Sequence, residues 1–166
     1  MNVNLNNMKE IKSTVKESKL QKFYEFSQNN TGGSFVTNSQ VCHRLLIEAA
    51  SEAEAELKAE SMGVYFNGVD EGMDCPCCGD RWYSGHEVSF PRSYGSMTEK
   101  EAASVAEKYG ASVAASKGGW KDRNWDVVFA TPESYAQYLA DEYGWTSPDV
   151  RIFRSDGSVV EIYSAK

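Results

Sequence analysis

Apolar and polar positions along the chain fall into short runs separated by Gly, Asn, Asp and Ser, a pattern typical of short strands joined by turns. The aromatic run at residues 23–27 predicts a strand, and the glycine-rich turn at 29–33 predicts a hairpin that returns through 34–36. A longer apolar run predicts a third strand at 41–48. Further short strands are expected at residues 64–66, 82–83, 86–90, 111–115, 125–130, 150–154 and 158–163.

Three segments carry the start and stop signals of helices. Ser51 with Glu54, and Thr98 with Glu101, have the capping-box spacing, and a glycine follows each segment. Pro132 after a threonine marks the first turn of a third helix. The expected helices are residues 51–62, the segment from 98 to the glycine at 110, and 132–143.

Runs of strands interspersed with three helices indicate an α+β fold with a mainly antiparallel sheet, and not a doubly wound nucleotide-binding fold. The length of 166 residues suits one domain, which we expect to span residues 21–166. A subdivision near residues 91–97, read as a loop, is the alternative. Residues 1–20 are expected to form a flexible or weakly helical basic arm, and residues 67–85 a long loop.

Composition narrows the classes of function. Acidic side chains outnumber basic ones by 24 to 17, and the net charge of −7 argues against a general nucleic-acid binder, because phosphate contacts require clustered Lys and Arg. The sequence contains no run of about 18 apolar residues and no apolar stretch of the secretory-signal type near its start. A cytoplasmic protein without a membrane span is therefore expected.

The candidate chemistry lies in the long loop, at the segment DCPCCGD. Cys75 and Cys78 have the C-x-x-C spacing of a zinc-knuckle turn, which brings two thiolates to one side. Zinc requires four ligands, and His86 is the expected third. Cys42 or His43 is the expected fourth; adjacent residues of a strand face opposite ways, so only one of them can reach the ion. The sequence thus predicts a structural zinc site that pins the long loop to the sheet.

Two other interpretations of the cysteines stay open at this stage. They are either reduced cysteines buried in a tight turn, which needs no metal, or a redox-active dithiol. If zinc is bound, we expect the Cys77→Ser change to cost less stability than the same change at Cys75 or Cys78, because only the latter two have the ligand spacing.

Aromatic residues make up 12% of the chain and gather in its second half. Many of them are expected in the core. Those that are exposed beside arginines would form a stacking surface for a ligand or a protein partner. The candidates for this surface are Arg81, Trp82, Tyr83, Arg92, Trp120 and Arg123.

Three segments carry a resemblance to a known family: KFYEFSQNNTGGSF at 22–35, VCHRLLIEA at 41–49 and GVYFNGVDEGMDCPCCGDRWY at 63–83. They resemble a family of small uncharacterised proteins encoded by tailed bacteriophages. The resemblance covers about half of the chain and implies a viral accessory protein. It implies no catalytic residues.

Two functions from different classes follow as expectations. The first is a non-enzymatic phage accessory protein that binds a host protein or a small nucleotide signal, with the CPCCG loop stabilised by a structural metal. The alternative is a small metal-dependent hydrolase of nucleotides or phosphoesters. A closed site of Cys and His favours the first function, whereas an open site with a carboxylate favours the second.

Overall fold

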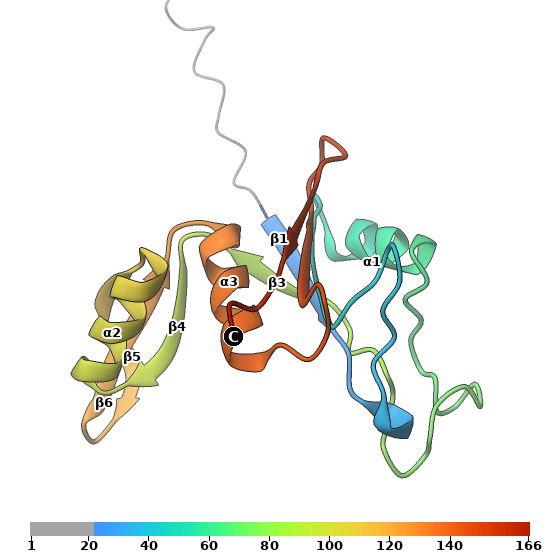
Figure 1. The fold of residues 1–166 in the computed structure, drawn as a ribbon, viewed down its shortest axis with the longest axis horizontal. Helices are drawn as coiled ribbons and strands as arrows, with labels where there is room; N and C mark the ends of the chain where they lie inside the picture. The colour runs from blue at the N-terminus through green and yellow to red at the C-terminus, as the bar shows by residue number, and fades with distance from the viewer. Residues whose placement is uncertain (1–21) are drawn as a thin grey trace, which may run out of the picture.

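The computed structural model describes residues 22–166, which form three α-helices and eight strands in two sheets (Figure 1). The expected basic arm at residues 1–20 lies outside the described residues. None of the helices within residues 22–166 has the length and apolarity that crossing a lipid bilayer requires.

The larger sheet has five strands in the order β3-β1-β2-β7-β8. In this order they span His86–Ser89, Lys22–Ser27, Arg44–Glu48, Val150–Phe153 and Val159–Ile162. Every neighbouring pair is antiparallel except β2 and β7, which run parallel. The expected α+β fold with a mainly antiparallel sheet is confirmed.

The smaller sheet has three antiparallel strands in the order β4-β6-β5. They span Arg92–Met97, Arg123–Phe129 and Ser112–Trp120. Residues 92–97 were expected to be a loop, and that prediction is wrong: β4 pairs with β6 and leads the chain from the larger sheet into the smaller one. The strand breaks its register at a bulge between Gly95 and Met97, which explains why its sequence lacks a regular alternation.

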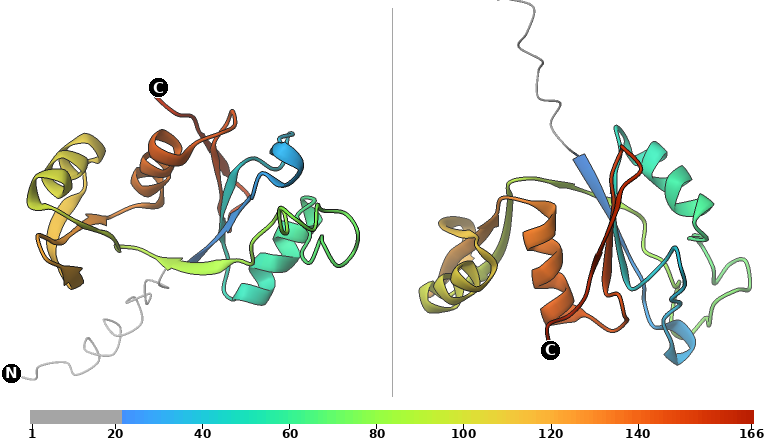
Figure 2. Two further views of the ribbon diagram at one scale, coloured as in Figure 1. Left: turned by 90° about the horizontal axis from the view of Figure 1, so that it is seen from below. Right: turned by 45° about the horizontal axis from the view of Figure 1, so that its top comes forward.

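The three helices are α1 (Glu52–Ser61), α2 (Glu99–Tyr109) and α3 (Pro132–Tyr143), close to the expected ranges. Each begins at the predicted cap, since a side-chain oxygen of Ser51, Thr98 or Thr131 accepts a backbone N–H of the first turn. Figures 1 and 2 show α1 and α3 on opposite sides of the larger sheet, with α2 beside the smaller sheet.

Each side of the larger sheet has its own apolar core. On one side the rings of Phe23, Phe129 and Tyr135 belong to a cluster that includes residues of α2, α3 and both sheets. On the other side Phe26, Leu45 and Trp82 belong to a cluster that includes buried alanines of α1. The second cluster lies under the long loop and gives that loop an apolar base.

Two expected strands are absent from the described residues. Residues 34–36 pair with no strand, because the Gln28 side chain bonds both backbone groups of Val36: Nε2 donates to the carbonyl at 2.7 Å and Oε1 accepts the N–H at 2.8 Å. Residues 64–66 follow α1 directly, and the Val64 N–H donates to the carbonyl of Ala59 at 3.1 Å. Their apolar side chains cover the second core cluster without joining a sheet. Residues 82–83 contribute only one isolated bridge, between Gln28 and Trp82.

Candidate metal centre

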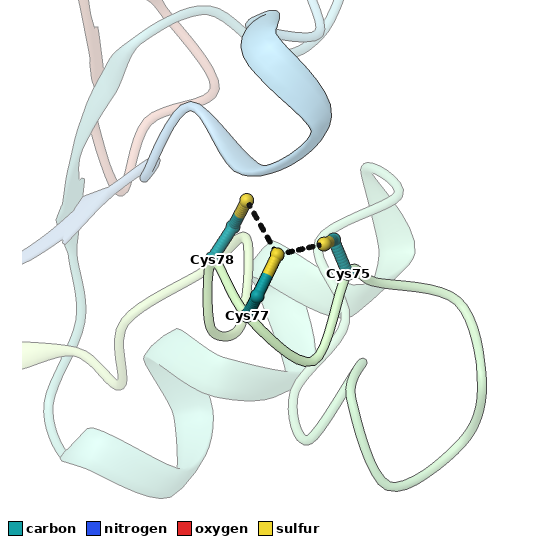
Figure 3. Close-up of side chains that lie close together, drawn as sticks. All are labelled: Cys75, Cys77 and Cys78. Atoms are coloured by element: carbon teal, nitrogen blue, oxygen red, sulfur yellow. Dashed lines mark hydrogen bonds between the residues drawn. The ribbon is translucent and has the colours of Figure 1, made fainter.

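Three cysteines lie together near the tip of the long loop between α1 and β3 (Figure 3). The Sγ atoms of Cys75, Cys77 and Cys78 all lie within 4.8 Å of one another. Cys77 lies between the other two, with its Sγ 2.8 Å from that of Cys75 and 3.7 Å from that of Cys78. Within residues 22–166 this is the group of three or more Cys, His, Asp or Glu side chains that could hold a metal ion.

The turn that gathers the sulfurs is closed by backbone hydrogen bonds. The carbonyl of Cys75 accepts the N–H groups of Cys78 at 3.0 Å and Gly79 at 3.1 Å. Gly79 has φ 84°, a left-handed conformation that a residue with a Cβ adopts at a cost. The expected zinc-knuckle-like turn therefore forms, and it brings in Cys77 as well as the two cysteines with C-x-x-C spacing.

The close approach of the thiols separates their pKa values. The hydrogen bond from Cys77 lowers the pKa of Cys75 from 9.0 to about 7, since it stabilises the thiolate. The pKa of Cys77 rises to about 11, because the neighbouring Cys75 and Cys78 sulfurs favour its protonated form. A cluster with one readily ionised thiol is prepared to bind a metal ion, because the thiolate is the form that coordinates.

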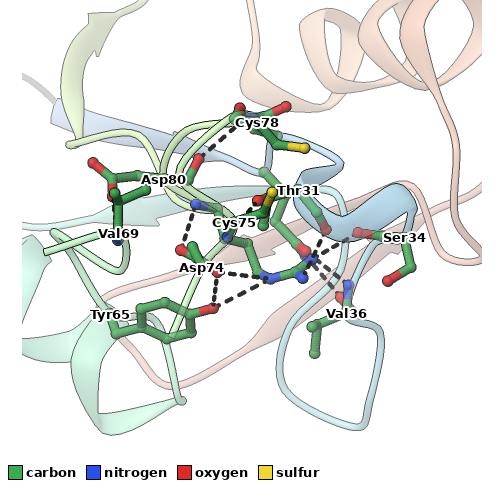
Figure 4. A network of polar contacts seen from close by, with 12 residues as sticks. Thr31, Ser34, Val36, Tyr65, Val69, Asp74, Cys75, Cys78 and Asp80 are labelled. Atoms are coloured by element: carbon green, nitrogen blue, oxygen red, sulfur yellow. Dashed lines mark hydrogen bonds and ion pairs between the residues drawn. The ribbon is translucent and has the colours of Figure 1, made fainter. Parts of the chain in front are cut away.

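The base of the loop is held by a buried carboxylate (Figure 4). The side chain of Asp74 is only 1% exposed. Its Oδ1 accepts the hydroxyl of Tyr65 at 2.8 Å, and its Oδ2 accepts the backbone N–H of Arg81 at 2.7 Å. The guanidinium of Arg81 lies 3.8 Å from Oδ1, so the negative charge of Asp74 is paired as well as hydrogen-bonded.

Arg81 extends this network to the short 3-10 turn at Thr31–Gly33. Its guanidinium donates to the carbonyl of Ser34 at 2.7 Å and to that of Thr31 at 3.1 Å. The Thr31 hydroxyl in turn accepts the N–H of Cys75 at 3.3 Å, and the Asn29 amide donates to the carbonyl of Cys78 at 2.6 Å. Protein groups thus supply the fastening of the loop that the sequence analysis assigned to a metal.

Cys42 and His43, the expected fourth ligands, precede β2 and contact other groups. The thiol of Cys42 is buried and donates to the carbonyl of Arg44 at 3.1 Å; its burial raises the pKa to about 12. The ring of His43 lies 4.6 Å from that of Phe35, and burial lowers the pKa of this histidine to about 4. Neither residue belongs to the cysteine group.

His86, the expected third ligand, is also outside the cysteine group. It begins β3 and is paired with Glu25 of β1, and its Nε2 lies 3.6 Å from Oε2 of that glutamate. The strand pairing therefore directs His86 to a different carboxylate partner. The sequence-based prediction took Cys75 and Cys78 as ligands and left Cys77 out. Three cysteines within four residues were nevertheless a signal that all three could converge.

The residues that were expected to form one aromatic and arginine surface lie in different parts of the structure. Trp82 is 3% exposed and belongs to the core, so its assignment to a surface is wrong. Arg81 serves the loop network, and the guanidinium of Arg92 lies 5.0 Å from the ring centroid of Tyr135. Tyr83 and Trp120 are exposed, but Tyr83 bonds to the end of β1 and Trp120 ends β5 in the other sheet. Arg123 is paired with Glu101.

The chain is similar in sequence to one protein family. The family model described as a domain of unknown function, DUF7296, matches residues 21–124. This range includes the cysteine loop, its polar anchor and the first strands of both sheets. Comparisons with curated proteins and with solved structures found no match.

Proposed function

The chain belongs to the DUF7296 family, whose description names no activity, and we propose that it is a non-enzymatic binding protein whose cysteine loop holds a zinc ion. The observation that carries this proposal is the convergence of three sulfur atoms within 4.8 Å on an exposed turn. Thiolates are ligands that zinc prefers.

Zinc suits the dimensions of the cluster. A tetrahedral zinc with Zn–S bonds of about 2.3 Å sets its sulfurs about 3.8 Å apart. The separation of 3.7 Å between Cys77 and Cys78 matches that value, and the 2.8 Å separation between Cys75 and Cys77 would open by about 1 Å on binding.

Three cysteine ligands would leave one position of a four-coordinate zinc for a further ligand. Because Cys77 and Cys78 are exposed, a Cys or His side chain of a partner protein can reach that position. The loop itself needs no metal for its fastening, since the Asp74 and Arg81 network supplies it. We therefore assign the metal to recognition at the loop tip, and not to the stability of the loop base.

The hydrolase alternative has less support from the described residues. A catalytic zinc needs a general base beside its bound water. The carboxylates next to the cysteines in sequence accept other hydrogen bonds. Asp74 is buried and accepts the hydroxyl of Tyr65, and Oδ1 of Asp80 accepts the N–H of Val69 at 2.8 Å. The donor group consists of sulfur alone.

The proposed setting is the cytoplasm of a bacterium during infection by a tailed phage, as the sequence resemblance implies. Between the two expected partners we favour a host protein over a small nucleotide signal. A nucleotide brings phosphate charge toward a chain with a net charge of −7, whereas a protein partner is able to complete the zinc site with a neutral histidine or a thiolate.

Affinity purification from host cells tests this proposal. The tagged wild-type chain is compared with the Cys75→Ser/Cys78→Ser double variant, and the Cys42→Ala variant serves as a control because Cys42 lies outside the group. We expect a host protein that is retained by the wild type and by the control but lost with the double variant or with a zinc chelator. Identical retained proteins in all samples would refute a zinc-dependent binding function.

A further inference from the structure

A hollow of about 600 Å³ lies beside the smaller sheet, away from the cysteine loop. Its lining comes from β4, from α2, from the end of α3 and from Arg123 at the start of β6. The chemistry of this lining is dominated by aromatic rings and by ionised side chains. The residues that matter for the argument are Tyr94, Tyr138, Tyr143, Glu101, Glu142 and Arg123.

Three tyrosine rings form a corner of the hollow. The ring of Tyr138 stands at 65° to that of Tyr94, with centroids 5.3 Å apart, and at 80° to that of Tyr143, with centroids 6.1 Å apart. The hydroxyls of Tyr94 and Tyr143 lie 3.4 Å from each other. Tyr138 is 4% exposed and packs edge to face with the other two rings, so the tyrosines open to the hollow are half-buried Tyr94 and exposed Tyr143. An aromatic ring face attracts an organic cation.

The charges of the lining favour the same kind of ligand. Arg123 is neutralised locally, because its Nη2 lies 3.3 Å from Glu101 and its Nε donates to the carbonyl of Ser96 at 3.0 Å. Glu142 is exposed at the hollow and has no ion-pair partner among residues 22–166. The hollow thus retains one uncompensated carboxylate, which attracts a cation and repels phosphate or carboxylate groups.

One tyrosine already contacts a cation from outside the hollow. The guanidinium carbon of Arg44 lies 5.9 Å from the ring centroid of Tyr143. Arg44 does not give the hollow a net positive charge, because its Nη1 lies 2.7 Å from the buried carboxylate of Glu25. The positive charge that this arginine presents to an incoming ligand is therefore largely cancelled.

We propose that this hollow binds an organic cation, an ammonium or guanidinium group, held by the rings of Tyr94 and Tyr143 and by the carboxylate of Glu142. Two sources supply this chemistry: a free small cation, or the lysine or arginine side chain of a protein partner. The site is independent of the cysteine loop, so it stands whether or not zinc is bound there.

Ligand-observed NMR at low ionic strength tests the proposal with choline as the probe. Its neutral analogue 3,3-dimethyl-1-butanol has the same shape without the charge. We expect choline to bind roughly tenfold more tightly than the analogue, in line with the strength of cation–π and carboxylate contacts at a partly open site. A parallel titration with acetyl-arginine amide distinguishes the two sources, because tighter binding of the amide than of choline indicates a partner side chain.

Two exposed substitutions localise the binding. Glu142→Gln removes the charge at the hollow and should weaken choline binding several-fold, while Glu107→Gln, an exposed change on α2 away from the lining, should leave it unchanged. Tyr143→Ala should weaken binding further and is checked for folding by circular dichroism. Equal affinity for choline and its neutral analogue, absence of choline binding, or equal binding by Glu142→Gln and the wild type would each overturn the proposal.

Discussion

The Sγ atoms of Cys75 and Cys77 lie 2.8 Å apart on an exposed turn whose base is anchored by buried polar groups. The two parts of the loop therefore have separate tasks. The anchor holds the backbone in place, and the cysteines at the tip are free to bind a metal ion. The predictions below follow from this separation.

Each of the three cysteines should contribute to metal affinity. Replacing Cys75, Cys77 or Cys78 by serine is expected to weaken Co²⁺ or Zn²⁺ binding by about 100-fold, since the loss of one of the few ligands removes a large share of the binding energy. Titration of Co²⁺ against its thiolate charge-transfer absorption measures this effect. Cys42→Ala is the matched control and should bind as the wild type does. Unchanged affinity in Cys77→Ser would support the sequence-based assignment over the structural one.

Thiol reactivity should differ sharply between the loop and the core. In the metal-free protein the pKa of Cys75 is lowered to about 7, so its alkylation rate should rise with pH and reach half of its maximum near pH 7. Cys42 should remain unmodified until the protein unfolds, because burial raises its pKa to about 12. Mass spectrometry after timed exposure to iodoacetamide locates the modified residues. A Cys42 that reacts as fast as Cys75 would contradict the described burial.

The Asp74 anchor should contribute strongly to stability. Asp74→Ala is expected to lower the free energy of unfolding by about 3 kcal/mol, because it leaves the guanidinium of Arg81 without its carboxylate and the Tyr65 hydroxyl without its acceptor. Urea denaturation measures the change, and Asp70→Ala, an exposed substitution in the same loop, is the control. Equal effects of the two substitutions would mean that the anchor is not formed.

A methyl group at Gly68 should disturb the same anchor. A Cβ at this position would lie 2.0 Å from Oδ2 of Asp74, so Gly68→Ala is expected to cost about 2 kcal/mol in unfolding free energy. At Gly118 a Cβ would meet no atom within 4 Å, and Gly118→Ala should have little effect. Thermal or urea unfolding of the pair checks this difference, and a neutral Gly68→Ala would place the anchor elsewhere.

Metal removal should leave the protein folded. Because the loop base is held by protein groups, chelation should lower the melting temperature without loss of the far-ultraviolet circular dichroism spectrum. Added zinc at about 100 times its dissociation constant should restore about 2.7 kcal/mol of stability by mass action. Unfolding of the protein on chelation would instead favour the structural zinc site that the sequence predicted.

Local signals in the sequence predicted local structure well. The cap residues Ser51, Thr98 and Thr131 fixed the helix starts, since each contact spans only three residues. The parallel pairing of β2 with β7 was not predicted, because it joins segments about one hundred residues apart. The Gln28 side chain hydrogen-bonds both backbone groups of Val36, and no local sequence pattern indicates this contact.

In the candidate metal site, too, the sequence predicted the local contacts but not the contacts between distant segments. The turn at Cys75 and Cys78 was predicted from spacing, because it is closed by bonds within five residues. His86 was expected to be a metal ligand, but the register of β3 against β1 pairs it with Glu25. Local sequence signals do not predict that register. Asp74 directly precedes the first cysteine, and nothing in the sequence indicated that it would be buried against Tyr65.

X-ray absorption at the zinc edge of the purified protein tests the central claim most directly, because it counts the atoms bound to the metal. The account predicts about one zinc per chain with three sulfur neighbours at about 2.3 Å and one lighter ligand. A protein that purifies and remains without zinc after zinc is added, or a zinc bound by nitrogen and oxygen alone, would contradict the claim that Cys75, Cys77 and Cys78 form a metal site.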